Sequence, residues 1–593
     1  MPKISFNNGA LAALFLAVLV GACSCSKTRA DNDASQQLRQ LLAEEWQYEL
    51  KSSPESATYL GDKRYNSELT DYSPAARRKD ADTNRDFLRK FEAIEAGDLN
   101  PENALNRRLM IRRLQDAIDS YDLKAWEMPV DQMNGVHLGF AQLPGYTAFT
   151  DSHDYDDYVS RLKKLPTAFR QIEEDLRLGM GDRLAPPRYL LEKVAVQAEQ
   201  IANTAPDKSP FAGPLDRFPG GISDSDQQRI RSSVLNAIKS DVLPAYRTFG
   251  EFVRTDYEPH GRTDPGVWSL PNGDALYRRD VRLMTTTKLS PEQFHEIGLK
   301  QVNEFEAKML SLAKSQGYHD LKSFNAFVKN NRRFYAASAE QIVDLYRNYL
   351  GQMRTEMPRL FSHMPRAQLE VKAMEAFRAK DGAPADYTPG SQDGKRPARI
   401  NVNTWDPTHR LTLNIEATAY HEGIPGHHQQ IALAQEMTDL PEFRRNGGYN
   451  AFVEGWALYA ERLGKEVGFY QDPYSEYGRL ENEMWRAVRL VVDTGVHYKH
   501  WSRQQMVDFF HAHTALDEPS IQSEVDRYIA WPGQALAYKA GQLNILEMRE
   551  KARRELGERF DLRAFHDAVL SKGALPLDVL DDQLNAWIEQ RKP

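Results

Sequence analysis

The sequence predicts a mainly α-helical protein with one small β element. Residues 38 to about 200 carry the pattern of successive amphipathic helices with charged outer faces, and helical patterns return after Ser290 and after Glu454. Residues 399–404, which read Arg-Ile-Asn-Val-Asn-Thr, alternate as a strand does. Hydrophobic residues make up 41% of the chain and aromatic residues 10%, which is typical of a globular protein.

The beginning of the chain has the features of an export signal. Residues 9–22 form an apolar run that is preceded by Lys3. The run has the length of a signal-peptide core and is too short to span a bilayer comfortably. We therefore expect residues 1–22 to be a signal peptide.

The end of this run carries a lipidation signal. It reads Val-Gly-Ala-Cys, which resembles the processing box of bacterial lipoproteins. Cys23 is the expected lipidation site, and ordinary secretory cleavage near Ala22 is the alternative. Ser24 resembles the signal for outer-membrane sorting in Gram-negative bacteria, and the polar residues 23–37 should form a flexible tether. We expect an exported lipoprotein, periplasmic or surface-facing, whose lipid is its only membrane anchor.

Cysteine content and net charge exclude several kinds of site in the body of the protein. Cys23 and Cys25 are the only cysteines of the 593 residues, so the body has no disulfide framework and no cysteine-based metal site. A metal ion would have to bind histidine and carboxylate side chains. The formal net charge of −8, without a long basic run, argues against a nucleic-acid partner.

The body divides into two helical regions in this reading. An N-terminal region covers residues 38–255, and a C-terminal region with the candidate catalytic residues covers 256–593. We expect the two to form one continuous fold. Ser290 should cap one helix, and Ser502 should cap another through a capping box with Gln505.

The main motif is the stretch 420–429, which reads Tyr-His-Glu-Gly-Ile-Pro-Gly-His-His-Gln. It is a stretched form of His-Glu-x-x-His, in which two histidines four apart on a helix bind one zinc ion. From His421 the next histidines, His427 and His428, lie six and seven residues on, and a regular helix suits neither spacing. Pro425 lacks an N–H and would clash with a preceding carbonyl, so the helix should kink or bulge there. A two-residue bulge would make His427 the second ligand, and His428 is the alternative.

A third metal ligand is expected on the next helix. Glu454 follows His427 by 27 residues, close to the roughly 25 residues that separate these ligands in one large class of zinc peptidases. A structural salt bridge at Glu454 is one alternative, and Glu461 as the ligand is another. Two histidines and a carboxylate would leave a fourth position open on a Zn²⁺ ion.

The strand predicted at 399–404 lies just upstream of this motif. In zinc peptidases an edge strand beside the active-site helix pairs with the substrate backbone. A small structural hairpin is the alternative interpretation.

The motif and the block Glu-Gly-Trp-Ala-Leu-Tyr-Ala-Glu at 454–461 resemble the two signature blocks of the bacterial "domain of unknown function 885" family. Further stretches resemble this family at 53–61, 285–292, 493–497 and 531–538, so the resemblance covers nearly all of the chain after the leader. The family is similar to glutamate-type zinc peptidases. The resemblance implies a large helical zinc-peptidase-like fold, with the β element beside the active-site helix, and a peptidase chemistry without a particular substrate.

The chemistry expected at such a centre is amide hydrolysis. Zn²⁺ would activate a water molecule, and Glu422 would accept its proton and later donate it to the leaving amine. The oxyanion needs a further donor, for which His497 and Tyr538 are the candidates; packing roles are the alternative for both.

Two functions follow from these residues. The first is a zinc-dependent peptidase that acts on oligopeptides in the cell envelope, and a related amide hydrolase of cell-wall peptides would use the same residues. The alternative is a helical envelope lipoprotein that binds a ligand or a metal without catalysis. Glu422 discriminates between them, because metal binding alone requires no acid–base glutamate.

Overall fold

The computed structural model describes residues 33–133, 135–380 and 382–592. Within this part, one compact unit comprises residues 33–52 and 75–124, and a second comprises residues 53–74 and 125–592. The candidate metal ligands all belong to the second unit.

The predicted signal peptide, Cys23 and most of the predicted tether lie outside the described residues. The last tether residues, 33–37, are described, and they already form the first turns of a helix that runs to residue 52. Ser35 and Leu38 are both buried in it, so the tether ends earlier than expected because this polar segment packs as helix.

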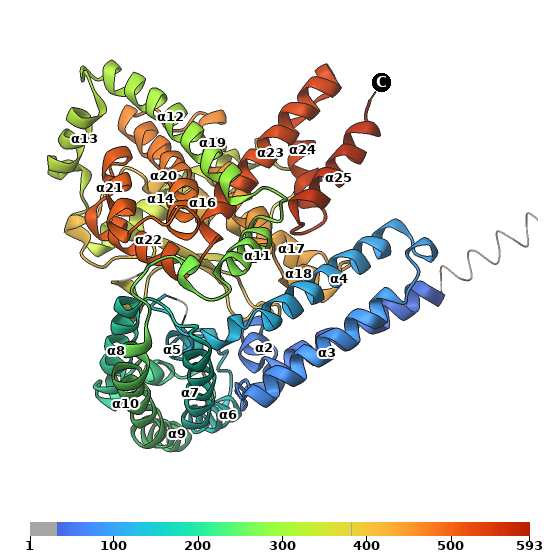
Figure 1. Cartoon of the computed structure of the whole chain (residues 1–593), viewed down its shortest axis with the longest axis vertical. Helices are drawn as coiled ribbons and strands as arrows, with labels where there is room; N and C mark the ends of the chain where they lie inside the picture. Colours follow the sequence, from blue (N-terminus) through green and yellow to red (C-terminus); the bar gives the residue numbers. More distant parts are fainter. Residues whose placement is uncertain (1–32, 134, 381, 593) are drawn as a thin grey trace, which may run out of the picture. The chain divides into compact units, whose positions relative to one another are not determined.

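The first unit consists of three helices, namely residues 33–52, α3 (Pro74–Glu92) and α4 (Pro101–Asp122) (Figure 1). Side chains bridge each pair of helices. The Tyr48 hydroxyl donates to Asp80 at 2.5 Å, and Arg85 pairs with Asp122 at 2.5 Å. Arg113 lies 3.7 Å from Glu45.

The N-terminal part of the second unit is a bundle of helices around an aromatic core. Phe169 contacts Tyr246 and Phe249, with ring centroids 4.9 and 4.7 Å apart, and Phe140 packs edge-on against it. The helices are α2 (Pro54–Leu60), α5 (Val136–Tyr146), α6 (Ser152–Leu162), α7 (Leu165–Asp182), α8 (Arg188–Ala202), α9 (Asp224–Ala237) and α10 (Leu243–Phe252). Helical structure continues from α10 to His260, so it passes the boundary expected after residue 255.

The C-terminal part of the second unit is a larger helical assembly that carries the candidate site. Its long central helix, α20 (Pro473–His497), is buried over most of its length, and Figure 1 shows it among the helices at the top of the view. The other helices are α11 (Gly273–Thr285), α12 (Pro291–Ser315), α13 (Leu321–Asn330), α14 (Ala339–Leu360), α15 (Ala376–Ala379), α16 (Ile415–Glu422), α17 (His427–Glu436), α18 (Glu442–Asn446), α19 (Asn450–Glu466), α21 (Arg503–His513), α22 (Glu518–Ala530), α23 (Gln534–Leu556), α24 (Leu562–Leu570) and α25 (Leu577–Glu589). The predicted caps at Ser290 and Ser502 are confirmed, since each forms a capping box.

Two glycines bring helices α19 and α23 into close contact beside the site. A Cβ atom on Gly541 would lie 1.7 Å from the carbonyl oxygen of Ala451, and one on Gly455 would lie 2.4 Å from the Cα atom of Gly541. Only residues without a side chain allow this crossing. It sets Glu454 of α19 and Tyr538 of α23 on the same cavity.

A three-stranded sheet lies upstream of the motif helix, with strand order β1-β3-β2. Strand β3 (Ala398–Val402) pairs in parallel with β1 (Leu369–Ala373) and antiparallel with β2 (Ala385–Thr388). The predicted strand is therefore confirmed as β3, but its expected role as a substrate-binding edge is wrong, because both of its edges are already paired. The edge strand that lines the candidate site is β2.

None of the helices in the described part of the chain combines the length and apolar character needed to cross a membrane.

Candidate metal centre

The motif forms two helices with a tight turn between them. Helix α16 ends at Glu422, and α17 begins at His427 after four residues. The N–H of Gly426 donates to the Tyr420 carbonyl at 2.9 Å, and a Cβ atom on Gly426 would lie 1.9 Å from the carbonyl oxygen of His421. The interruption expected near Pro425 is confirmed, although it is a complete break of the helix and not a bulge within it.

This turn brings His427 beside His421. The two imidazole rings stand edge to face, with centroids 4.8 Å apart. Glu454 Oε2 lies 3.4 Å from Nε2 of His421 and 3.5 Å from Nε2 of His427. One ligand atom from each of His421, His427 and Glu454 lies within 4.8 Å of the other two, as expected from the sequence.

The spacing of these three atoms fits a tetrahedral zinc ion. Zinc–nitrogen and zinc–oxygen bonds of about 2.0–2.2 Å give a tetrahedron whose edges measure roughly 3.3–3.6 Å. Glu454 Oε2 is buried and makes no hydrogen bond within the described part of the chain. A buried carboxylate oxygen between two imidazole nitrogens is the donor set that zinc prefers.

The protonation of Glu454 also suits a metal ligand. Burial alone would raise the pKa of its carboxyl group, but the contacts with His421 and His427 outweigh burial and hold this pKa well below its usual range. The group is therefore a carboxylate at neutral pH.

Glu461, the alternative ligand, lies behind the first histidine. Its Oε1 atom is 2.9 Å from Nδ1 of His421, while its other oxygen accepts from Asn482 at 3.1 Å. Arg486 lies 3.4 Å from the same carboxylate. Glu461 is thus a partner that orients His421, because it occupies the ring nitrogen that faces away from Glu454.

His428, the alternative second ligand, points away from the cluster. Its Nδ1 atom lies 3.1 Å from the Tyr387 hydroxyl, and its Nε2 atom lies 3.2 Å from the carbonyl oxygen of Ala367. Burial lowers the pKa of His428 to about 4, so its ring is neutral. His428 thus connects α17 to the sheet region, and His427 is the histidine of α17 that joins the cluster.

The cluster opens into a cavity of about 430 Å³. Tyrosines 59, 146, 387 and 538 and glutamines 132, 142 and 197 are among its lining residues, together with β2 residues 385–388. Its charged lining residues are Arg378, Asp386, Glu422, Glu454 and Arg527. Glu422 and Glu454 lie in the two sequence motifs, whereas the other three come from segments with no motif.

Glu422 lines this cavity next to the cluster, as expected for an acid–base residue. Burial raises the pKa of its carboxyl group to about 8, and the neighbouring Glu454 acts in the same direction. An ion bound at the cluster would oppose this shift, because a nearby positive charge favours the carboxylate.

Of the two expected oxyanion donors, the structure brings only Tyr538 to the site. Its ring is stacked 6.1 Å from that of His421 between centroids, and its oxygen accepts hydrogen bonds from Arg527 at 2.8 Å and from Gln534 at 3.3 Å. These two bonds leave the hydroxyl hydrogen for an acceptor within the cavity.

The expectation for His497 is wrong. Its Nδ1 atom accepts from the N–H of Val267 at 3.1 Å, and its Nε2 atom donates to the carbonyl of Tyr528 at 2.9 Å. Burial lowers the pKa of His497 to about 3, and the residue does not line the cavity. It is a core histidine that joins three segments through backbone hydrogen bonds.

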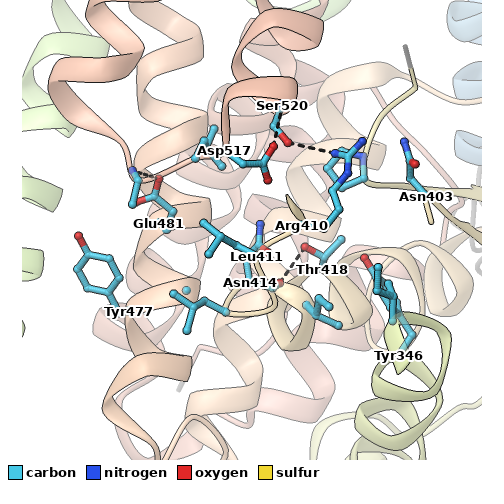
Figure 2. Close-up of a pocket in the computed structure, with 17 residues that line it drawn as sticks. Tyr346, Asn403, Arg410, Leu411, Asn414, Thr418, Tyr477, Glu481, Asp517 and Ser520 are labelled. Atoms are coloured by element: carbon cyan, nitrogen blue, oxygen red, sulfur yellow. Dashed lines mark hydrogen bonds between the residues drawn. The ribbon is translucent and has the colours of Figure 1, made fainter. Parts of the chain in front are cut away.

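A smaller cavity, of about 50 Å³, lies at the other end of α16. Figure 2 shows Thr418 of that helix, Asn414 directly before it, and Glu481 and Arg410 around this cavity. Arg410 donates to Ser520 at 3.3 Å, and Glu481 accepts from the N–H of Ala515 at 2.6 Å. Because its volume would hold only a few water molecules, the larger cavity is the better candidate for a substrate site.

Comparison with known proteins is consistent with this fold. A bacterial family described as protein of unknown function, DUF885, matches residues 54–584. A candidate lipoprotein from Colwellia psychrerythraea has a solved structure that is similar over 94% of this chain and 100% of its own, with 29% sequence identity and a TM-score of 0.87. No curated protein matches the chain.

A second solved structure shares the fold. This candidate lipoprotein of unknown function from Shewanella oneidensis is 16% identical, with a TM-score of 0.69 over 92% of this chain and 99% of its own. At this identity, the likeness concerns the fold alone.

Proposed function

The chain belongs to the DUF885 family of bacterial proteins of unknown function, and we propose that it is a zinc-dependent peptidase that hydrolyses oligopeptides in the cell envelope. The observation that carries this proposal is the convergence of His421, His427 and Glu454 at a cavity that Glu422 also lines. Three ligands with an open fourth position, beside an acid–base glutamate, are the parts of a hydrolytic zinc site.

His421, His427 and Glu454 would hold the ion. When bound, zinc would lower the pKa of a water molecule toward neutrality and polarise the carbonyl group of the substrate. Glu461 would keep the Nε2 atom of His421 directed at the site through its hydrogen bond to Nδ1.

Glu422 would act as the general base and then as the general acid. Its carboxylate accepts a proton from the attacking water as the water oxygen bonds to the carbonyl carbon of the peptide. The carbon–nitrogen bond then breaks, and Glu422 donates the proton to the leaving amine. The products are one carboxylate and one amine.

Tyr538 would stabilise the oxyanion of the tetrahedral intermediate. Arg527 and Gln534 donate to its oxygen, so its own hydrogen can be donated to the substrate. Such a donor contributes about 10²–10³ to kcat in well-characterised hydrolases.

Strand β2 offers the substrate a place to bind as an additional strand. Its residues Ala385–Thr388 pair with β3 along one edge, and they also line the cavity. An extended peptide laid along the other edge would receive backbone hydrogen bonds that do not depend on its sequence.

The envelope location rests on the N-terminal signal and on a relative. The apolar run before Cys23 favours export and lipidation, and the similar Colwellia protein is itself described as a candidate lipoprotein. Replacement of Cys23 by Ser should release the protein from the membrane fraction, whereas an unchanged fraction would contradict the lipid anchor.

The function is tested with a mixed peptide library and the purified protein. We expect cleavage that a chelator abolishes and added zinc restores. The variant Glu422→Gln should retain zinc and lose cleavage, with Glu466→Gln on α19 as the control. Cleavage by Glu422→Gln would contradict the proposed base, and zinc binding without cleavage by either protein would favour the metal-binding lipoprotein.

A further inference from the structure

Arg527 holds the Tyr538 hydroxyl in the proposed chemistry, but that chemistry makes no use of its positive charge. Arg378 pairs with Asp386 at 2.6 Å. Glu422 and Glu454 belong to the metal centre. Arg527 is the remaining charged side chain among the described lining residues.

The ion pair of Arg527 is weak because its partner is shared. Arg527 Nη1 lies 3.5 Å from Oε1 of Glu524, at the long end of the range for an ion pair. Arg489 approaches the same carboxylate at 2.8 Å, and Tyr528 donates to it at 2.5 Å. Two guanidinium groups therefore share one carboxylate, which leaves one positive charge in excess.

This excess charge is buried. The exposed fractions are 9% for Arg527, 2% for Arg489 and 1% for Glu524. Nη1 of Arg489 also makes no hydrogen bond within the described part of the chain. Because an unmatched buried charge is costly, a cation at a cavity surface favours an anionic ligand.

Arg527 lies close to the metal centre. Its Nη2 atom donates to the Tyr538 hydroxyl at 2.8 Å, and the Tyr538 ring stacks on His421. One tyrosine side chain thus separates the guanidinium from the first metal ligand. An extended peptide spans about 3.3–3.6 Å per residue. A substrate carboxylate bound to Arg527 would therefore lie roughly one to three residues from a peptide bond held at the metal centre.

The cavity also has room for the remainder of a substrate. Gln142 lines both this cavity and a second one of about 560 Å³. A peptide anchored at Arg527 could therefore extend past Gln142.

We propose that Arg527 binds a carboxylate group of the substrate next to the scissile bond, which makes the protein selective for peptides with a carboxylate at that position. This inference rests on the proposed peptidase function. The carboxylate is either the C-terminal one, which would give removal of residues from the C-terminal end, or that of an acidic side chain. Nη2 of Arg527 already donates to Gln534 at 2.9 Å and to Tyr538 at 2.8 Å, so the carboxylate would bind the remaining N–H groups of this permanently charged side chain.

The test compares matched peptides and measures kcat/KM. One pair differs only in a free or amidated C-terminus, and a second pair, amidated throughout, has Glu or Gln beside the cleavage site. The wild-type protein should prefer the carboxylate member of one pair by about 10- to 100-fold, as expected for hydrogen bonds to a charged group. The preferred pair identifies the source of the carboxylate.

Variants then assign this preference to Arg527. Arg527→Gln should bring the ratio close to one, and Arg527→Lys should retain part of it. Because Arg527 also holds Tyr538, Arg527→Gln should in addition lower kcat for all four peptides alike. Arg503→Gln is the control, since Arg503 pairs with Asp526 at 2.7 Å and does not line the cavity. The ratio of kcat/KM between the carboxylate peptide and its neutral partner is measured on the wild-type protein alone. The preference for a carboxylate can therefore be tested even if Arg527→Gln misfolds.

Three results have distinct meanings. Equal cleavage of both members of both pairs by the wild type would overturn the inference and leave the peptidase function standing. An equal loss of kcat for all peptides in Arg527→Gln, at an unchanged ratio, would also overturn it, because Arg527 would then only position Tyr538. No cleavage of any peptide by the zinc-loaded protein would contradict the proposed function itself.

Discussion

Nδ1 of His421 and Oε1 of Glu461 lie 2.9 Å apart, although 40 residues separate them in the chain. The contact joins the end of α16 to the middle of α19, and Glu461 is completely buried. The contact leaves Nε2 of His421 facing Glu454, so Glu461 of α19 orients the candidate ligand His421 on α16.

The contact predicts that Glu461 controls metal affinity without binding the metal. Glu461→Gln should weaken zinc binding by about 10- to 100-fold, as is typical for partners of metal-bound histidines. Competition with a chromophoric chelator measures this affinity. Glu466→Gln is the matched control, because Glu466 lies on the same helix and pairs with Arg549 at 2.7 Å. Equal zinc affinity in both variants would contradict the orienting role.

The crossing of α19 and α23 should be intolerant of any side chain at its centre. Gly541→Ala places a Cβ atom against the carbonyl of Ala451, so the helices must separate. Overpacking of this kind costs about 1–3 kcal/mol and sometimes more. We expect a lower thermal unfolding midpoint together with weaker zinc binding, because Glu454 lies beside this crossing.

The control for this substitution is Gly351→Ala in α14. A Cβ atom there would meet nothing within 4 Å. Alanine in a helix interior is favoured over glycine by about 0.5–1 kcal/mol, so this variant should be as stable as the wild type or more stable. Similar destabilisation by both alanines would show that the crossing is not close-packed.

Tyr538→Phe should affect catalysis more than metal binding. Loss of the hydroxyl should lower kcat by about 10²–10³ with zinc content unchanged, because the hydroxyl is assigned to the oxyanion. Steady-state kinetics and elemental analysis measure the two quantities. Tyr459→Phe is a suitable control, since Tyr459 is buried in α19 and does not line the cavity. Unchanged kcat in Tyr538→Phe would remove the tyrosine from the mechanism.

Much of the candidate metal centre can be predicted from the sequence, because the residues that form it lie in short stretches of the chain. Pro425 and Gly426 require an interruption of the helix, and the interruption determines that His427 and not His428 joins His421. The position of Glu454 follows from its spacing to His427 in the sequence, although the short helix α18 lies between α17 and α19. Membership of the DUF885 family likewise follows from the two blocks that carry these residues.

Other features depend on packing between distant segments. Glu461 shares a helix face with Glu454, and only the depth of its burial makes it a partner of His421 instead of a ligand. Arg527 has no motif, because its place in the cavity results from the packing of α22 against α20 and α21. Strand β3 was predictable as a strand, but its central position depends on β1 and β2, which have no comparable sequence pattern.

His497 provides a prediction for pH dependence. Burial lowers the pKa of His497 in the folded state to about 3, against an ordinary value of 6.5. As the pH falls, the imidazole of the unfolded chain therefore takes up a proton at a higher pH than that of the folded protein. Its contribution to stability is therefore present above pH 6.5 and decreases as the pH falls toward 3. Between pH 7.5 and 5, the wild type should lose up to about 2 kcal/mol more of its unfolding free energy than His497→Gln does.

Urea unfolding at the two pH values measures this difference. An equal loss in both proteins would show that the imidazole of His497 already carries a proton in the folded state. Peptide cleavage at pH 7.5 by folded His497→Gln should remain, because the residue does not reach the cavity.

Zinc content after dialysis, measured by elemental analysis of the wild type, His427→Ala and His428→Ala, tests the metal centre most directly. We predict about one zinc ion per chain for the wild type and for His428→Ala, and a large loss for His427→Ala, because His427 directs a nitrogen at Glu454 and His428 does not. Absence of stoichiometric zinc from the wild type, or an equal loss in both variants, would contradict the ligand set and the peptidase function built on it.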